Sequence, residues 1–505
     1  TGDMNDSSSS DVRPKLLPRR QRISIGKCIV LSDSRLHTAS EDSQTKRFDS
    51  ACTQDDPTVN QPSVAAPDIA SVHRDAPLQR LYGRIAWRIL PFMLLCYVLA
   101  YLDRVNISFA KLQMQRDLGL SDAAYGLGAG VFFLGYMLLE VPSNLLLEKI
   151  GARKTISRIM ILWGMTSAAM MFVHDGPSFY LLRFLLGTFE AGFAPGMILY
   201  LTFWFSDARR ASVMAIVLMA GPIAGMLGGP LSAWIMTAFQ GTHGLAGWQW
   251  LFLAEGLPCV LLGAVALWYL DDSPSNARWL SDAERALLLA ETDATSARSR
   301  HAALRTALKD PRVYAMAFSY FCLVCGLYTV SFWLPTLLRV AGVASTAELG
   351  WYAALPYLAT VIAVPLLAGH SDRRRERRMH SAIPAVAGAL GLLLAATLSP
   401  RLGGLLLCMT LVTICIYTAY VVFWSFPTAY LRGTAAAGGI AFINSIGLLG
   451  GFVSPSLIGW LKAETGTLQS GLMAMALILC AGGASILLNR MPAEETRAQE
   501  ETPHI

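Results

Sequence analysis

The sequence predicts an all-α integral membrane protein with about twelve membrane-spanning helices. Of its 505 residues, 54% are hydrophobic and only 15% are charged, whereas soluble domains carry roughly 25% charged residues. The charges avoid a series of apolar windows, each close to the roughly 20 residues that cross a bilayer core. A large soluble fold is disfavoured, because few polar segments are left to cover so many apolar helices.

The apolar windows form two groups of six, separated by a polar stretch at about 271–311. The first group lies near residues 89–110, 126–147, 156–174, 178–204, 212–237 and 248–270. The second group lies near residues 312–338, 349–369, 380–399, 404–427, 435–460 and 469–489. In each group a short basic loop follows the second window, so we expect two pseudo-symmetric six-helix bundles.

These patterns divide the chain into five segments. They are a disordered hydrophilic tail (1–78), a six-helix bundle (79–270), a cytoplasmic central loop (271–311), a second six-helix bundle (312–490) and a cytoplasmic tail (491–505). The sequence starts with Thr1 and Met4 follows soon after, so whether the first segment belongs to the mature protein stays open. In the central loop, Ser281 and Glu284 have capping-box spacing, which predicts a short amphipathic helix.

Basic residues gather in alternate loops. Clusters follow the second, fourth and eighth windows, at Lys149–Arg158, Arg209–Arg210 and Arg373–Arg378. The loops between them carry few basic residues, chiefly Lys111, Arg116, Arg339, Arg401 and Lys462. The positive-inside rule then places both termini in the cytoplasm, which agrees with an even number of spans. We expect a multi-pass, monomeric protein of a bacterial inner membrane, in contact with the lipid bilayer.

A few charged residues stand out inside the apolar windows of the first group. They are Asp103 and Arg104 in the first window, Glu140 in the second, and Arg183 and Glu190 in the fourth. A charge in the hydrocarbon region is costly, so it usually pairs, faces a cavity or serves transport. Arg183 and Glu190 are seven residues apart, so they share one face of their helix. The second group offers no comparable charge.

Asp103 and Arg104 are adjacent, so on a helix their side chains point about 100° apart. We expect Arg104 to face a central cavity and to hold a substrate carboxylate there. Asp103 is then expected to face the fourth window, near Arg183 and Glu190. Carboxyl groups beside arginines in a region of low dielectric are suited to carry protons, which makes the proton the expected coupling ion. A static ion-pair network between the first and fourth helices is the alternative.

Neutral side chains complete the predicted substrate site. The candidates are Tyr101 and Tyr136 from the first group and Tyr328, Trp424 and Asn444 from the second. Packing within the membrane is the alternative role for the aromatic residues. Glu140 is followed by Val-Pro-Ser-Asn, and we interpret it as a gating or packing residue. The glycine- and proline-rich run 221–230 predicts close packing between the two groups.

Four stretches resemble the major facilitator superfamily, and more closely its anion:cation symporter family. They are Leu102–Ala110, Glu140–Lys154, Arg183–Pro195 and Gly247–Pro258. The resemblance covers about residues 80–490 and extends to carriers for sugar acids, tartrate, phthalate and hydroxyphenylacetate. It implies proton symport, with Asp103 and Glu190 as proton sites and Arg104 as the carboxylate anchor.

The resemblance also implies a gating motif in the loops. Its residues are Glu148, Gly151 and Arg153 after the second window, and Asp372 and Arg373 after the eighth. Some sugar-acid carriers have a glutamine in the fifth span. The matching region here, near Gly221, has no polar side chain, which favours a less polar or aromatic carboxylate.

We therefore predict a secondary active transporter that imports a small organic carboxylate by proton symport through alternating access. An efflux antiporter of the same fold is one alternative, although Arg104 disfavours a cationic cargo. A membrane nutrient sensor is a second alternative, but it would need a structured signalling extension. No enzyme, cofactor or metal is expected, because no catalytic constellation is found. No nucleic-acid partner is expected, because the arginine run at 373–378 is typical of a membrane-side anchor.

Overall fold

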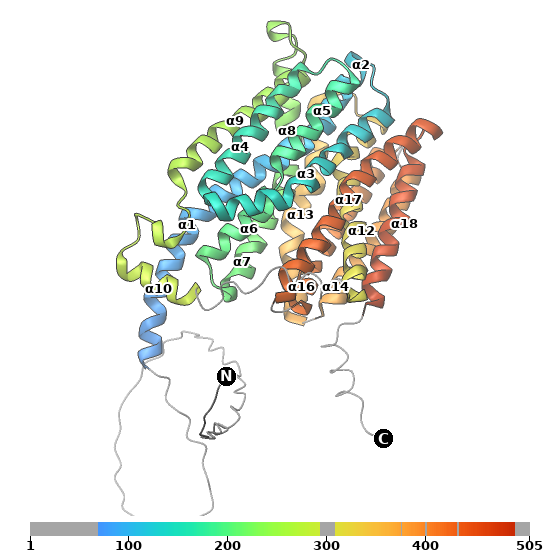
Figure 1. Ribbon diagram of the computed structural model, residues 1–505. Coiled ribbons are helices and arrows are strands. Elements are labelled where there is room, and N and C mark those ends of the chain that lie inside the picture. Colours follow the sequence, from blue (N-terminus) through green and yellow to red (C-terminus); the bar gives the residue numbers. More distant parts are fainter. Residues whose placement is uncertain (1–68, 293–308, 375, 399–400, 432–433, 490–505) are drawn as a thin grey trace, which may run out of the picture. The chain divides into compact units, whose positions relative to one another are not determined.

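The computed structural model describes residues 69–292, 309–374, 376–398, 401–431 and 434–489 (Figure 1). Over these residues every regular element is a helix. Twelve helical segments are long and apolar enough to cross a membrane, which confirms the predicted fold class. Most of the predicted N-terminal tail and all of the C-terminal tail lie outside the described residues.

The first half of the protein, defined here as residues 69–292, contributes six spans. The first span joins α1 (Ile69–Val105) to α2 (Ile107–Leu118), and the second and third are α3 (Asp122–Ile150) and α4 (Ala152–Ala169). The fourth joins α5 (Gly176–Glu190) to α6 (Phe193–Trp204), and the fifth joins α7 (Asp207–Leu218) to α8 (Ala220–Ala238). The sixth is α9 (Gly247–Tyr269), which the short α10 (Asp282–Thr292) follows.

The second half, residues 309–489, contributes the other six spans. They are α12 (Pro311–Val340), α13 (Thr346–Arg374), α14 (Arg377–Leu398), α15 (Leu402–Phe423), α17 (Thr434–Thr465) and α18 (Gln469–Leu488). The one-turn helix α16 (Ser425–Tyr430) extends α15. Most of α12 is enclosed by its neighbours, since 94% of its most apolar window is buried. Residues of α12 are therefore placed to contact the first half.

The halves meet most extensively at two helix pairs, α3 with α17 and α8 with α13, and α2 also contacts α12. Glycines allow these backbones to approach closely, as small residues do between membrane helices. A Cβ added to Gly126 would lie 2.3 Å from the carbonyl oxygen of Pro455, and one added to Gly229 would lie 2.5 Å from that of Gly350. Gly229 belongs to the glycine-rich run of the fifth span, so this contact agrees with the predicted close packing there.

The fourth span is interrupted directly after Glu190. Gly192 has a φ of 83°, a left-handed conformation that favours glycine. A Cβ at this position would also lie 2.5 Å from the side chain of Ser143 on α3. The break ends α5 at Glu190 and holds that residue at a helix terminus in the middle of the bundle.

The helix α10 confirms the predicted capping box. The backbone N–H of Ser281 donates to Glu284 Oε2 at 3.0 Å, and the backbone N–H of Glu284 donates to Ser281 Oγ at 3.3 Å. Arg84 of α1 forms an ion pair with Glu284 at 2.9 Å. These contacts, the Ser281 backbone first, hold the pKa of Glu284 below its usual range. The loop helix is thus tied to the start of the first span.

Candidate functional site

Arg104 lies where the two halves meet, and only 5% of it is exposed. Its Nη2 forms an ion pair with Glu190 Oε1 at the end of α5. Its Nη1 donates a hydrogen bond to the hydroxyl of Tyr328 on α12, at 3.0 Å. One guanidinium therefore connects the first and fourth spans to the second half of the protein.

Aromatic rings surround this guanidinium. Its central carbon lies 5.1 Å from the ring centre of Tyr101, 5.3 Å from that of Phe132 and 5.6 Å from that of Tyr136. Cation–π contacts of this kind stabilise a desolvated cation. The structure thus brings together Arg104, Glu190 and three of the predicted aromatic residues, Tyr101, Tyr136 and Tyr328.

The pairing of Arg104 with Glu190 leaves polar atoms unused. Within the described part of the chain, neither Arg104 Nε nor Glu190 Oε2 has a hydrogen-bond partner, although both atoms are buried. A planar guanidinium binds a carboxylate best through two parallel N–H donors. Glu190 therefore does not use all the donors of the guanidinium, and the remaining donors can bind the carboxylate of a ligand.

Asp103 points away from this pair, and the expectation that it faces the fourth span is wrong. Ser167 Oγ donates to Asp103 Oδ1 at 2.7 Å, while Trp163 Nε1 and Cys259 Sγ donate to Oδ2, each at 3.0 Å. These donors belong to α4 and α9, the third and sixth spans. Adjacent residues of a helix do point about 100° apart, but this angle does not determine which neighbouring helix each side chain meets.

Arg183 is fully buried and contacts α3 rather than Glu190. Its Nε and Nη2 donate to the carbonyl oxygens of Gly128 and Ala129, at 3.3 and 3.4 Å. Its guanidinium also lies over the ring of Phe132, at 5.1 Å. Among the described residues it makes no ion pair within 4.0 Å. Arg183 and Glu190 do lie in the same span, but their direct pairing is not observed.

Glu140 joins the halves at a second place. Asn444 Nδ2, on α17, donates to Glu140 Oε1 at 2.6 Å. Tyr136 lies one turn earlier on α3 and contacts Arg104 with its ring, so the two polar contacts are connected along one helix. Trp424 is half-buried and packs edge-to-face on Tyr320, with ring centres 4.8 Å apart. Trp424 and Asn444 do not contact Arg104 directly.

The predicted gating motif surrounds Asp272, which the sequence analysis did not identify. Arg153 donates its backbone N–H to Asp272 Oδ1 at 2.9 Å, and a Cβ on Gly151 would lie 2.4 Å from the same oxygen. Gly151 has a φ of 93°, so glycine is favoured there on two grounds. The side chain of Glu148 lies outside what the structure describes.

The matching loop of the second half makes only local contacts among the described residues. Asp372 lies 3.6 Å from Arg377, and Arg373 Nε donates to the carbonyl oxygen of Gly369 at 3.2 Å. Both Asp372 and Arg373 are exposed. Their gating role stays a prediction.

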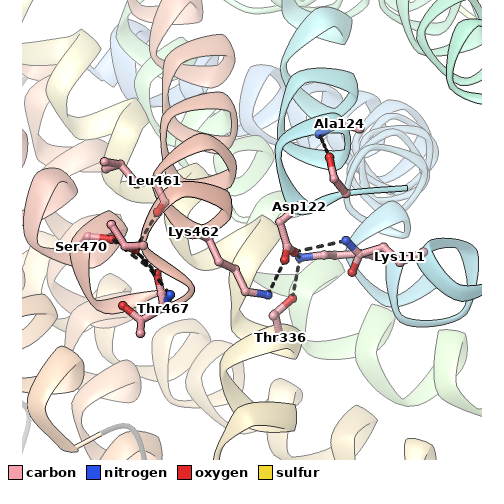
Figure 2. A network of polar contacts seen from close by, with 11 residues as sticks. Lys111, Asp122, Ala124, Thr336, Leu461, Lys462, Thr467 and Ser470 are labelled. Carbon is pink, nitrogen blue, oxygen red and sulfur yellow. Dashed lines mark hydrogen bonds and ion pairs between the residues drawn. The ribbon is translucent and has the colours of Figure 1, made fainter. Parts of the chain in front are cut away.

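Lys111 and Lys462, which the sequence placed in loops, belong to a polar network between the halves (Figure 2). Lys111 Nζ lies 2.8 Å from Asp122 Oδ1, and Lys462 Nζ lies 2.9 Å from Oδ2 of the same carboxylate. Lys111 is 1% exposed, contacts Thr336 at 3.4 Å and lies over the ring of Trp333 at 3.9 Å. The network connects α2 and α3 to α12 and α17.

A sequence signal for this network existed. Lys111 follows Arg104 by seven residues, so the two cations share a helix face. Their partners on α12, Tyr328 and Thr336, are correspondingly eight residues apart. We call the end of the bundle at Lys111, Asp122 and Lys462 the α2–α3 end.

Glu255 is a further buried carboxyl that the sequence analysis did not identify. It is 3% exposed on α9, and Ser232 of α8 donates to its Oε1 at 3.0 Å. Its position inside an apolar window was the available signal, since intramembrane carboxyls usually have a function.

Comparisons with known proteins agree with this architecture. The family profile described as Major Facilitator Superfamily matches residues 93–455. A "Putative tartrate transporter" of Agrobacterium vitis is 46% identical over 84% of this chain and 94% of its own length. A "Quinolone resistance transporter" of Acinetobacter baumannii is 40% identical over 79% and 92%. The "Inner membrane transport protein RhmT" of Escherichia coli is 39% identical over 83% and 96%.

A solved structure shows the same fold. A bacterial homolog of the human lysosomal transporter Spinster, in an inward-facing and unoccupied conformation, matches with a TM-score of 0.67. The match covers 82% of this chain and 98% of that chain, at 16% identity. At this level of identity the likeness concerns the fold alone.

Proposed function

The chain belongs to the major facilitator superfamily, and from this premise we propose that it imports a small organic carboxylate together with protons. Tartrate is the first candidate because of the relatives, in place of the less polar carboxylate that the region near Gly221 favoured. The protein is a multi-pass membrane transporter, and its relatives are transporters rather than enzymes. The tartrate-transporter relative at 46% identity supports a small organic acid as the substrate. The buried ion pair between Arg104 and Glu190 is the observation that carries the mechanism.

A substrate carboxylate and Glu190 compete for the same guanidinium. When Glu190 takes up a proton it loses its charge, so its hold on Arg104 weakens and the guanidinium can bind the substrate. Protonation without substrate would leave Arg104 buried and unpaired, which costs about 3–5 kcal/mol when a buried pair loses one partner. Proton and substrate therefore bind favourably only together, and this linkage is what symport requires.

The position of Arg104 between the halves supports alternating access. Its contact with Tyr328, and the contact of Glu140 with Asn444, both cross from one half to the other. A substrate bound at Arg104 would therefore contact both halves and would follow their relative movement. The lysine–carboxylate network closes the α2–α3 end in this conformation.

The orientation in the membrane follows from the charge of the loops. The positive-inside rule places both termini in the cytoplasm, and the α2–α3 end then faces outward. The relative from Escherichia coli is an inner membrane transport protein, which supports an inner-membrane location. Uptake of a monoanion against a potential that is negative inside costs about 2.3 kcal/mol per 100 mV, and one accompanying proton cancels that charge.

Export is a second candidate function. The quinolone resistance transporter is 40% identical to this chain, so a carrier closely related to this one is named for drug resistance. An exporter of this fold would exchange its cargo for protons rather than carry both in the same direction. The direction of the proton gradient that drives accumulation distinguishes the two functions.

The experiment is uptake into proteoliposomes under imposed proton gradients of either direction. Labelled tartrate is compared with a sugar acid, phthalate and hydroxyphenylacetate, and with a fluorescent quinolone. We expect one carboxylate to accumulate only under an inward gradient, and Arg104→Ala to abolish that accumulation. Exposed Glu348→Gln is the matched surface control. Accumulation under an outward gradient, or uptake by Arg104→Ala at the wild-type level, would contradict the proposal.

A further inference from the structure

Glu255 forms a polar cluster that does not contact the Arg104 site. Its Oε1 accepts a hydrogen bond from Ser232, while Oε2 is buried and has no partner among the described residues. The amide of Asn106 lies beside this carboxyl, is 1% exposed, and has neither its nitrogen nor its oxygen hydrogen-bonded in the same part of the chain. Unpartnered polar atoms from two helices therefore meet at Glu255.

Asp103 lies within electrostatic range of Glu255. Cys259, one turn along α9 from Glu255, donates to Asp103 and is the titratable group in contact with it. Glu190 and Arg183 of α5 lie within electrostatic range of Asp103 without contacting it. The remaining groups packed against the two carboxyls are Trp163 and Ser167 from α4, Ser232 from α8 and Asn106 from the junction of α1 and α2. All four are neutral.

In this conformation two buried carboxyls without a contacting cation hold one proton between them, because ionising both away from water is costly. Glu190 and Asp122 show the contrast, since Glu190 has Arg104 and Asp122 has two lysines. Glu140 is the other buried acid held by a neutral partner, Asn444. The hydrogen bonds indicate which acid is neutral here. Three donors point at the oxygens of Asp103, as a carboxylate requires. Glu255 accepts one, from Ser232, with the Asn106 amide beside it. Its Oε2 is not hydrogen-bonded among the described residues, so it can carry a proton.

A cavity between the halves reaches this cluster. Asn106 and Ser232, the two neighbours of Glu255, both line it. The rest of its wall comes from α1, α2 and α8 of the first half and from α12 and α13 of the second, including Gly228, Ser331 and Tyr357. A proton in this cavity would therefore need to pass only Asn106 and Ser232 to reach Glu255.

We propose that Glu255 is a second proton-binding carboxyl of the transport cycle, shares one proton with Asp103, and is loaded from the cavity between the halves through Asn106 and Ser232. This inference rests on the proposed proton symport. The Arg104–Glu190 pair then couples one proton directly to the substrate, and the Asp103–Glu255 pair carries another without touching it. The carrier would move two protons with each substrate molecule.

The test is the proton-to-substrate ratio, measured from the pH gradient at which net flux through reconstituted carrier reverses, at a fixed substrate gradient and with the membrane potential clamped at zero. We compare the wild type with Glu255→Gln, which imitates a permanently protonated acid, and with Glu348→Gln as the surface control. We expect the ratio to halve in Glu255→Gln, while exchange of labelled for unlabelled substrate at equal pH stays within about 2-fold of wild type. Glu348→Gln is expected to keep the wild-type ratio.

A wild-type ratio in a Glu255→Gln protein that exchanges substrate would overturn the inference and leave the proposed symport intact. A wild type without proton coupling would overturn both. If Glu255→Gln does not fold, Ser232→Ala gives the answer. Loss of a hydrogen bond donated to the carboxylate favours its protonated form, so half-maximal gradient-driven uptake should move to higher external pH. An unchanged pH profile in Ser232→Ala would contradict the role of Glu255.

Discussion

Arg104 and Asp103 are neighbours in one helix, yet they face regions of opposite character. Arg104 faces the boundary between the halves, where Glu190 and aromatic rings of its own half and the Tyr328 hydroxyl of the second half surround it. Asp103 faces its own half, where three neutral donors hold it. Contacts across the halves must break when the halves move, whereas contacts within one half can persist. The two sides of α1 are therefore suited to different tasks, substrate exchange on one and a lasting polar cluster on the other.

The largest expected effect is on the Arg104 side. Arg104→Lys keeps the charge but replaces a planar fork by a single ammonium group, which cannot bind a carboxylate through two parallel hydrogen bonds. We expect initial uptake rates to fall by roughly 100-fold, from the loss of about 2–3 kcal/mol of charge-assisted hydrogen bonding. Arg116→Lys, on the exposed surface of α2, is the control. Uptake within a few fold of wild type in Arg104→Lys would argue against a bidentate anchor.

Glu190→Gln separates binding from coupling on the same side. The amide cannot release a proton or pair with Arg104 as a charge, so the guanidinium becomes available to substrate at every pH. We expect exchange of labelled for unlabelled substrate to persist, and accumulation driven by the proton gradient to fall at least roughly 10-fold. Gradient-driven accumulation at the wild-type level would show that Glu190 is not the coupling acid.

On the Asp103 side, apart from the proton coupling tested at Glu255, the expected effects are on stability. Asp103→Asn places an amide N–H₂ against groups that already donate to this position. An unsatisfied buried donor costs about 1–3 kcal/mol, and we expect the midpoint of thermal unfolding in detergent to fall. Ser167→Ala removes one of the three hydrogen bonds and should cost about 1 kcal/mol. An Asp103→Asn protein as stable as wild type would mean that the three donors do not require a carboxylate.

The α2–α3 end offers the smallest effects. Asp122→Asn weakens both of its lysine contacts, so this end should open more often. Spin labels can be attached at exposed Arg116 and Glu464 after exposed Cys480 is replaced. Double electron-electron resonance should then show a larger share of long label-to-label distances in Asp122→Asn than in the wild type. Lys462→Ala should have less effect than Lys111→Ala, because Lys462 is partly exposed and Lys111 is buried. Equal distance distributions in wild type and Asp122→Asn would show that this network does not hold the α2–α3 end closed.

The sequence predicted the features that depend on local composition. It did not predict contacts that depend on which helices pack side by side. The twelve spans and the capping box at Ser281 and Glu284 follow from short stretches of chain. Three of the aromatic residues around Arg104 were identified because they lie inside the apolar windows, where they could line a cavity. The partners of Asp103 were missed, because helical geometry gives the angle between side chains but not the helix that lies there. Glu255 was overlooked although its charge interrupts an apolar window.

The central claim is that substrate displaces Glu190 from Arg104 only when Glu190 becomes protonated. It is tested most directly by adding substrate to purified carrier in weakly buffered solution and following the pH with an indicator dye. The account predicts an uptake of about one proton for each carrier that binds substrate, and no uptake in Glu190→Gln, which still binds. Substrate binding without proton uptake by the wild type, or equal uptake by Glu190→Gln, would contradict it.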